Sequence, residues 1–117
     1  KFRFLEWKVY KDSKYLVNKI FHLSRKLPQE YKFSIGEQIN RSGLSVALNI
    51  AEGSGRKTSS EFHRFLDIAL GSAYETLAAL DILKDNEFIN EKEFNELYDK
   101  LYDITNQLGA LKKKNYS

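Results

Sequence analysis

The sequence predicts an all-α fold, an up-down-up-down antiparallel four-helix bundle that forms a single domain over residues 1–117. Apolar residues recur at spacings of three and four along the chain, as they do on one face of an α-helix. The chain has one proline and six glycines, whereas a β-sandwich or barrel needs turn residues about every 8–12 positions. Its apolar content of 42% and aromatic content of 14% argue against disorder, because such a chain can bury a core.

The first predicted helix stops at Pro28, because a proline disfavours helical geometry in the residue before it. Its apolar residues follow helical spacing and form one stripe. The stripe comprises Tyr10, Ser13, Val17, Ile20, Phe21, Ser24 and Leu27, widened by Val9, Leu16 and Leu23. Basic residues occupy much of the remaining surface of this helix.

The second predicted helix begins at Ser34, which has the spacing of a capping box with Glu37, and ends at Gly53. It carries two apolar stripes. The first comprises Ile35, Ile39, Gly43, Val46 and Ile50, and the second comprises Leu44, Leu48 and Ala51. A helix that is apolar on more than one side has more than one partner, so the second stripe predicts self-association of the chain.

The third predicted helix begins at Thr58, again with capping-box spacing to Glu61. Its stripe comprises Phe62, Phe65, Leu66, Ala69, Ala73, Leu77, Leu80 and Leu83. Gly71 lies in its interior, where glycine costs about 1 kcal/mol relative to alanine. We therefore expect a close helix crossing at Gly71.

The fourth predicted helix is capped by Asn90, with Glu93 three residues later. Its apolar positions alternate between spacings of three and four, as in a heptad-like seam. They are Phe94, Leu97, Leu101, Ile104, Leu108 and Leu111. The connections between the four helices are short, so sequential neighbours are predicted to be antiparallel.

The net charge of +3 hides a division along the chain. Residues 1–57 hold 12 basic and 5 acidic groups, a net charge of +7, and residues 58–111 hold 4 basic and 11 acidic groups, a net charge of −7. Lys112, Lys113 and Lys114 add three positive charges and complement the C-terminal helix dipole. Halves of opposite sign suit packing within the chain or contact between copies, and ordinary solvated helix faces are the alternative interpretation.

Several classes of protein are excluded by composition. Cysteine is absent, which excludes disulfides, thiolate zinc sites, iron–sulfur clusters and a cysteine nucleophile. No apolar run approaches the roughly 18 residues of a membrane span, and the first residues lack the apolar core of a signal peptide. We therefore predict a cytoplasmic protein without membrane contact. Methionine is also absent, so we expect the natural first residues to be missing.

No constellation of residues predicts catalysis, a metal site or a cofactor. His63 and Asp67 share a helix face, but no third metal ligand is apparent. Residues 49–58 superficially resemble a phosphate-binding loop, yet Ala51 and Arg56 stand where that pattern needs glycine, and a helix precedes them instead of a strand. Two interpretations of this segment remain, an anion-contacting loop or a plain turn.

Polar residues in small or apolar surroundings mark the second and third helices. They are Gln38, Arg41, Asn49 and Glu75. Because buried polar groups need partners, these residues form either a structural network between the two helices or part of a binding site.

Basic residues interleave with Trp7, Tyr10 and Tyr15 near the N-terminus. Cations neutralise phosphates and aromatic rings stack on bases, so this pattern predicts contact with nucleic acid. The candidate contacts are Lys8, Lys11, Lys14, Arg25, Lys26, Arg41, Arg56 and Lys57, with help from the three C-terminal lysines. In the alternative interpretation the rings belong to a core and the lysines only solubilise the protein, which then serves as a scaffold for protein contacts.

One set of residues, spread over nearly the whole chain, carries a resemblance to a known family. It comprises Trp7, Leu27, Pro28, Gln38, Ile39, Arg41, Ser45, Val46, Asn49, Ile50, Ala51, Glu52, Gly53, Gly55, Arg56, Glu61, Phe62, Phe65, Leu66, Ala69, Gly71, Ser72, Ala73 and Glu75. In these positions the sequence resembles the bacterial "four helix bundle protein" family. Its members include proteins encoded in intervening sequences of large-subunit ribosomal RNA genes, and the accessory variability determinant of diversity-generating retroelements is related to it.

The resemblance implies properties that periodicity does not. These are a four-helix bundle, a barrel-like homopentamer, and contact with RNA or DNA, and with a reverse transcriptase, through a basic surface. It implies no catalytic residue. The sequence has Asn40, Arg41 and Ser42 where the family usually has Arg-Arg-Ala, and Ala47 where the family often has proline. The first departure removes one cation and so weakens any nucleic-acid role at that position.

Overall fold

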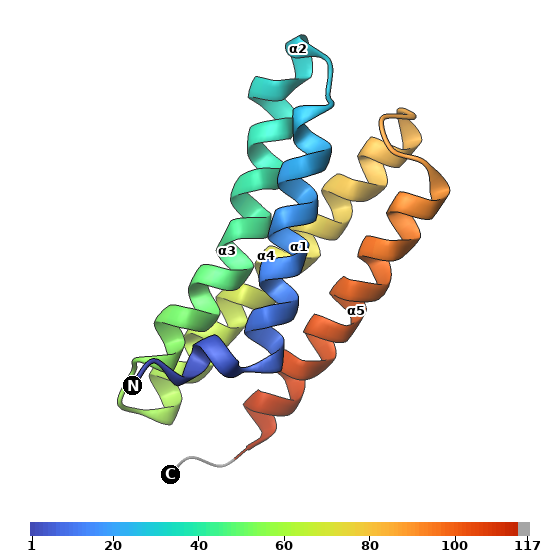
Figure 1. Cartoon of the computed structure of the whole chain (residues 1–117). Helices are drawn as coiled ribbons and strands as arrows, with labels where there is room; N and C mark the ends of the chain where they lie inside the picture. Colours follow the sequence, from blue (N-terminus) through green and yellow to red (C-terminus); the bar gives the residue numbers. More distant parts are fainter. Residues whose placement is uncertain (115–117) are drawn as a thin grey trace.

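Four long helices form an antiparallel bundle in the computed structural model, which describes residues 1–114 (Figure 1). The helices are α1 (Lys8–Arg25), α3 (Glu37–Ser54), α4 (Ser59–Asp85) and α5 (Glu91–Lys113). Three short elements accompany them, the 3-10 helix η1 (Arg3–Glu6), the single turn α2 (Gln29–Tyr31) and the π-helical turn η2 (Lys32–Gly36). The all-α four-helix prediction is confirmed.

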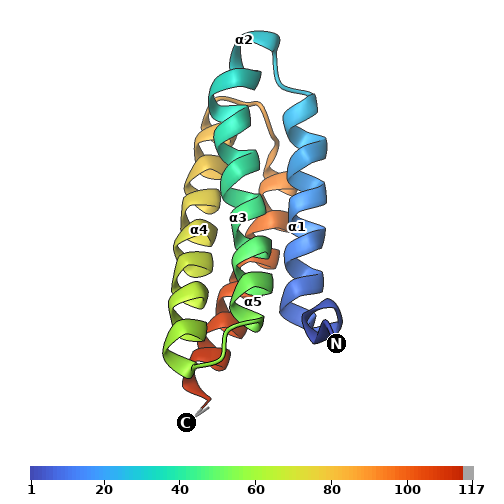
Figure 2. The same ribbon diagram turned by 90° about the vertical axis from the view of Figure 1, so that its left-hand side faces the viewer.

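The four helices alternate in direction, and each packs against two others. Helix α1 contacts α3 and α5, and α4 contacts the same two helices from the opposite corner. Figure 2 shows α4, α3 and α1 side by side with α5 behind them. The bundle measures 48 × 23 × 21 Å, so it is long enough for its two ends to carry separate surfaces.

The core consists of the apolar stripes that the 3–4 spacing predicts. Its fully buried large side chains are Leu16, Ile20, Ile39, Val46, Ile50, Leu66, Leu80, Leu83, Leu97, Leu101, Ile104 and Leu108. In α5 the four buried residues are four of the predicted seam positions. Burying one such side chain contributes about 1.5–3 kcal/mol, so the seam accounts for much of the attachment of α5.

Gly43 and Gly53 lie where neighbouring helices approach closely, and Gly71 does not. A Cβ atom at Gly43 would lie 2.9 Å from Cδ1 of Ile20 in α1, and one at Gly53 would lie 2.9 Å from Cβ of Phe65 in α4. At Gly71 no atom lies within 4 Å of the added Cβ position. The expected close crossing at Gly71 is therefore wrong, because this residue lies on the exposed side of α4.

Helix ends follow the predicted caps at two of three places. The side chain of Thr58 accepts a hydrogen bond from the amide of Glu61 at 3.1 Å. At the start of α5, Asn90 accepts from the amide of Glu93 at 2.8 Å, and Glu93 accepts from the amide of Asn90 at 2.9 Å, which completes a capping box.

The predicted cap at Ser34 is wrong. Helical backbone runs through η2 into α3, so Ser34 is not a first residue, and its hydroxyl donates to the carbonyl of Tyr31 at 3.2 Å. The prediction that Gly53 ends the second helix is also wrong, since α3 continues to Ser54 and is capped by Gly55. The absence of a side chain at Gly53 instead allows Phe65 of α4 to pack close to the α3 backbone.

Candidate nucleic-acid interface

Three segments meet at the lower end of the bundle in Figure 1, the start of α1, the loop between α3 and α4, and the end of α5. Trp7, which immediately precedes α1, is half-buried there. Its ring packs edge-on against Phe62 of α4, with 6.1 Å between the ring centroids. Trp7 also lines two separate open cavities, one on the side of α5 and one on the side of the α3–α4 loop.

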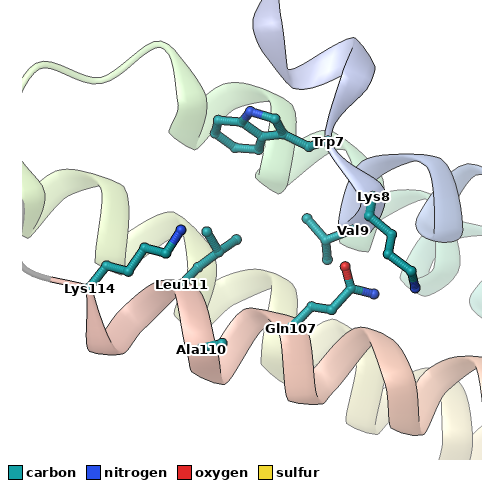
Figure 3. Close-up of a pocket in the computed structure, with 7 residues that line it drawn as sticks. All are labelled: Trp7, Lys8, Val9, Gln107, Ala110, Leu111 and Lys114. Atoms are coloured by element: carbon teal, nitrogen blue, oxygen red, sulfur yellow. The ribbon is translucent and has the colours of Figure 1, made fainter.

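The first cavity, of about 370 Å³, lies between the start of α1 and the end of α5. Figure 3 shows Leu111 and Lys114 extending from α5 toward the Trp7 ring, with Gln107 reaching toward α1. The lining residues are Trp7, Lys8, Val9, Gln107, Ala110, Leu111 and Lys114. The cavity therefore combines one aromatic ring, an apolar floor and two ammonium groups.

The second cavity, of about 270 Å³, lies against the N-terminus of α4. It is lined by Trp7, Gly53, Ser54, Arg56, Lys57, Thr58, Ser59 and Phe62. The Arg56 guanidinium is partly neutralised, because it binds Glu52 at 2.7 Å and lies 4.7 Å from the centroid of the Phe65 ring. Within residues 1–114, Lys57 forms no ion pair. The positive end of the helix dipole adds to the potential of Lys57.

Lys8, which lines the first cavity, also forms ion pairs, one of which joins α1 to α5. Its ammonium group donates to Asp12 at 2.8 Å and to Asp103 of α5 at 2.9 Å. The hydrogen bond to Asp12, followed by that to Asp103, raises the pKa of Lys8 above its usual range. Burial opposes ionisation of Asp12, but hydrogen bonds from Lys8 and Gln107 outweigh it and hold the pKa of that carboxyl below its usual range. Lys8 is thus largely committed to joining α1 to α5.

The predicted basic contacts do not form one surface. Lys8, Arg56 and Lys57 line the cavities beside Trp7, and Lys11 follows one turn later but binds Glu6 at 3.2 Å. Lys14 lies on the same helix, 5.6 Å from the centroid of the Tyr10 ring.

The other three predicted contacts lie elsewhere. Arg25 and Lys26 stand at the opposite end of α1, about 25 Å away at 1.5 Å per residue. Arg41 is on α3, where it donates to Gln38 at 2.7 Å. Of the C-terminal lysines predicted to help, Lys114, which directly follows α5, lines the first cavity, whereas Lys112 is paired with Asp67.

Side-chain hydrogen bonds join α3 to α4 at three places. Gln38 donates to Glu75 at 3.0 Å, Ser72 donates to Ser45 at 2.8 Å, and Thr76 donates to Ser42 at 2.8 Å. Asn49 bonds within α3, to Ser45 at 2.9 Å. Of the residues predicted to form an interhelical network, Gln38 and Glu75 do link the two helices, but both are exposed and not buried.

No group of three or more His, Cys, Asp or Glu residues within residues 1–114 is arranged to hold a metal ion. Over the same residues, every helix is too short or too polar to cross a membrane.

Comparisons with known proteins identify the family. The family model for the 23S rRNA-intervening sequence protein matches residues 6–110. A solved structure of a protein with unknown function from the S23 ribosomal protein family of Bacteroides thetaiotaomicron VPI-5482 superposes with a TM-score of 0.84 at 28% sequence identity. The match covers 91% of this chain and 99% of that one. No curated protein matches the sequence. Because the family model spans nearly the whole bundle, the chain belongs to the 23S rRNA-intervening sequence protein family.

Proposed function

We propose that this protein acts by binding and not by catalysis, and that it contacts single-stranded RNA at the Trp7 end of the bundle. One observation carries the proposal. Trp7 stands between two open cavities, and each contains a lysine, Lys114 in one and Lys57 in the other, that forms no ion pair within residues 1–114.

An aromatic ring flanked by cations is the arrangement that single-stranded nucleic acids need. A base stacks on the ring while the lysines neutralise the phosphates on either side. The two cavities place a cation on each side of Trp7, so a strand that crosses the ring meets positive charge before and after it. RNA is the expected nucleic acid because the family is named for intervening sequences of 23S rRNA.

The experiment uses Trp7 as the probe, because it is the single tryptophan of the chain. A base that stacks on the indole is expected to quench its fluorescence during titration with a single-stranded oligouridylate. Arg56, Lys57 and Lys114 are the available phosphate contacts. At about 0.7 per phosphate for a single strand, three contacts predict a log–log salt slope of about −2.

A pair of variants matched in charge tests the location. Lys57→Gln with Lys114→Gln is expected to reduce the slope by about 1.4 and to weaken binding. Arg25→Gln with Lys26→Gln removes the same charge at the far end of α1 and is expected to leave both nearly unchanged. If both double variants weaken binding equally, the effect comes from net charge alone, and this result would contradict a site at Trp7.

We also propose that copies of the chain associate through the outer surface of α3 and α4. Leu48 of α3 is 54% exposed and Ile82 of α4 is 51% exposed, and Leu44 and Ile68 are exposed on the same two helices. Such a surface is typical of an interaction site. In a ring, of five copies by the family resemblance, the basic Trp7 ends would add their potentials.

A substitution at this surface tests the association. Leu48→Asp is expected to lower the particle mass in light scattering at micromolar concentration, whereas Phe33→Asp, at a still more exposed apolar position on η2, is expected to leave it unchanged. A wild-type monomer would contradict self-association. Two results together would favour the scaffold alternative. The wild type would retain a protein partner after nuclease treatment while Leu48→Asp does not, and oligouridylate would leave the Trp7 fluorescence unchanged.

A further inference from the structure

A groove between α4 and α5 presents three exposed tyrosines that the Trp7 site does not use. Tyr74 is 68% exposed, Tyr98 43% and Tyr102 61%. The rings of Tyr98 and Tyr102 are parallel, with 6.4 Å between centroids. The groove is lined by Ala73, Tyr74, Leu77, Tyr98, Leu101, Tyr102 and Thr105. Within residues 1–114 the three hydroxyls form no hydrogen bond, so both the rings and the hydroxyl groups are available to a ligand.

The aromatic row already holds one cation at its upper end. The Lys84 ammonium lies 4.1 Å from the centroid of the Phe94 ring, and the Phe94 ring lies 6.1 Å from that of Tyr98. Two carboxylates flank this ammonium, Asp81 at 3.9 Å and Glu91 at 3.8 Å. The contact of Lys84 with Phe94 is therefore an example, within the protein, of a cation bound on a ring face with carboxylates beside it.

Two carboxylates lie one helical turn from residues of the groove. Asp99 is exposed on α5 three residues before Tyr102, and Asp81 is exposed on α4 four residues after Leu77, although it also lies 3.9 Å from Lys84. Asp67, two turns before Tyr74, is paired with Lys112 and is not available to a ligand. Residues 58–111 carry a net charge of −7, so the phosphates of a nucleic acid would be repelled here even though bases can stack on tyrosine.

We propose that this groove binds an arginine-containing, positively charged segment of a partner protein. A guanidinium is planar and stacks on aromatic faces while its outer N–H groups bind carboxylates. The groove encloses about 190 Å³, below the roughly 300–1,000 Å³ of small-molecule sites, and so suits one side chain at a time. Charge complementarity selects this occupant, and the groove is separate from the RNA site at Trp7 in both position and sign.

The test measures binding of fluorescein-labelled hexa-arginine to the full chain by anisotropy, with hexa-glutamate as the reverse-charge probe. Tyr98→Leu with Tyr102→Leu removes both rings and is expected to weaken hexa-arginine binding about five- to thirtyfold, whereas Tyr98→Phe with Tyr102→Phe keeps the rings and is expected to weaken it less than threefold. Tyr74→Leu, at the most exposed of the three positions, provides a second ring deletion that does not depend on the stacked pair.

A charge-matched pair separates the groove from general attraction. Asp81→Asn with Asp99→Asn is expected to weaken hexa-arginine binding more than Glu30→Gln with Glu37→Gln, which removes the same charge elsewhere. The proposal is overturned if both pairs act equally, or if none of the ring deletions weakens binding. It is also overturned if the leucine variants lose oligouridylate binding, which would make the groove a nucleic-acid surface, or if their particle mass falls, which would make it a contact between copies.

Discussion

Substitution by alanine is expected to affect the stability of the protein differently at Gly53 and at Gly71. Gly71 lies in the interior of α4, where alanine is favoured over glycine by about 1 kcal/mol, whereas Gly53 lies in the last turn of α3, where this preference is weaker. At Gly53 the new Cβ would lie 2.9 Å from Cβ of Phe65 and 3.3 Å from Cδ1 of Phe62. The atom at 2.9 Å is next to the backbone, so the conflict is not relieved by rotating a side chain, and α3 and α4 must move apart.

The expected magnitude follows from comparing the two variants. Overpacking of this kind costs about 1–3 kcal/mol. The helix-propensity gain at Gly53, in the last turn of α3, is no larger than the gain at Gly71, so Gly53→Ala is expected to be less stable than Gly71→Ala by at least about 1–3 kcal/mol. Apart from its own helix backbone, Gly71→Ala meets no atom within 4 Å and is expected to stabilise the protein by up to about 1 kcal/mol. Gly53→Ala is expected to be neutral or to destabilise it by up to about 3 kcal/mol.

The assay is urea unfolding followed by far-UV circular dichroism, at two protein concentrations so that any association is separated from folding. Gly43→Ala provides an intermediate case, because its Cβ would meet the mobile Cδ1 end of Ile20 at 2.9 Å. If Gly53→Ala proves as stabilising as Gly71→Ala, the close approach of α3 and α4 at Gly53 is refuted.

Three further predictions concern the helix ends and the dependence of stability on pH. Asn90→Ala removes a complete capping box and is expected to cost about 1 kcal/mol of unfolding free energy, whereas Ser34→Ala, inside continuous helical backbone, is expected to change it by less than about 0.5 kcal/mol; equal losses would contradict the assigned start of α3. The pKa of Asp12 is held below its ordinary value of 3.8, so this carboxylate stabilises the fold above that value and loses its contribution as the pH falls through the lowered pKa. Urea unfolding between pH 5 and 2 should therefore show a smaller loss of stability for Asp12→Asn than for the wild type, and an unchanged loss would refute the role of Asp12. The pKa of Lys8 is raised above its ordinary value of 10.5. The stabilisation by its ammonium group is therefore complete below pH 10.5 and is lost as the pH rises through the raised pKa. Lys8→Gln is expected to lose less stability than the wild type in urea unfolding at alkaline pH, and an equal loss would contradict the role of Lys8.

The fold follows from local sequence patterns because four amphipathic segments and short connections leave few other arrangements. The alternating spacing of α5 identifies its buried residues, and the Asn90 cap identifies its first turn. Glycine positions are less informative from sequence. Whether a glycine admits a neighbour, as Gly53 does, or faces open space, as Gly71 does, depends on the rotation of one helix against another.

The candidate site depends more strongly on tertiary structure. The sequence places basic residues on the first two helices, but it does not show which of them meet the α3–α4 loop and the end of α5 beside Trp7. Nor does it show that Lys8 is committed to Asp103, 95 positions away along the chain. The groove tyrosines occur in two helices with no shared local motif, so only packing of α4 against α5 brings Tyr74 to Tyr98 and Tyr102.

The most direct test of the central claim is the salt-dependent quenching of Trp7 fluorescence by oligouridylate. The predicted result is quenching whose binding constant falls with a log–log salt slope of about −2. Lys57→Gln with Lys114→Gln is expected to weaken the binding and to reduce the slope by about 1.4, while Arg25→Gln with Lys26→Gln leaves both nearly unchanged. Unquenched fluorescence at low salt, or quenching that does not depend on salt, would contradict an RNA interface at this end of the bundle.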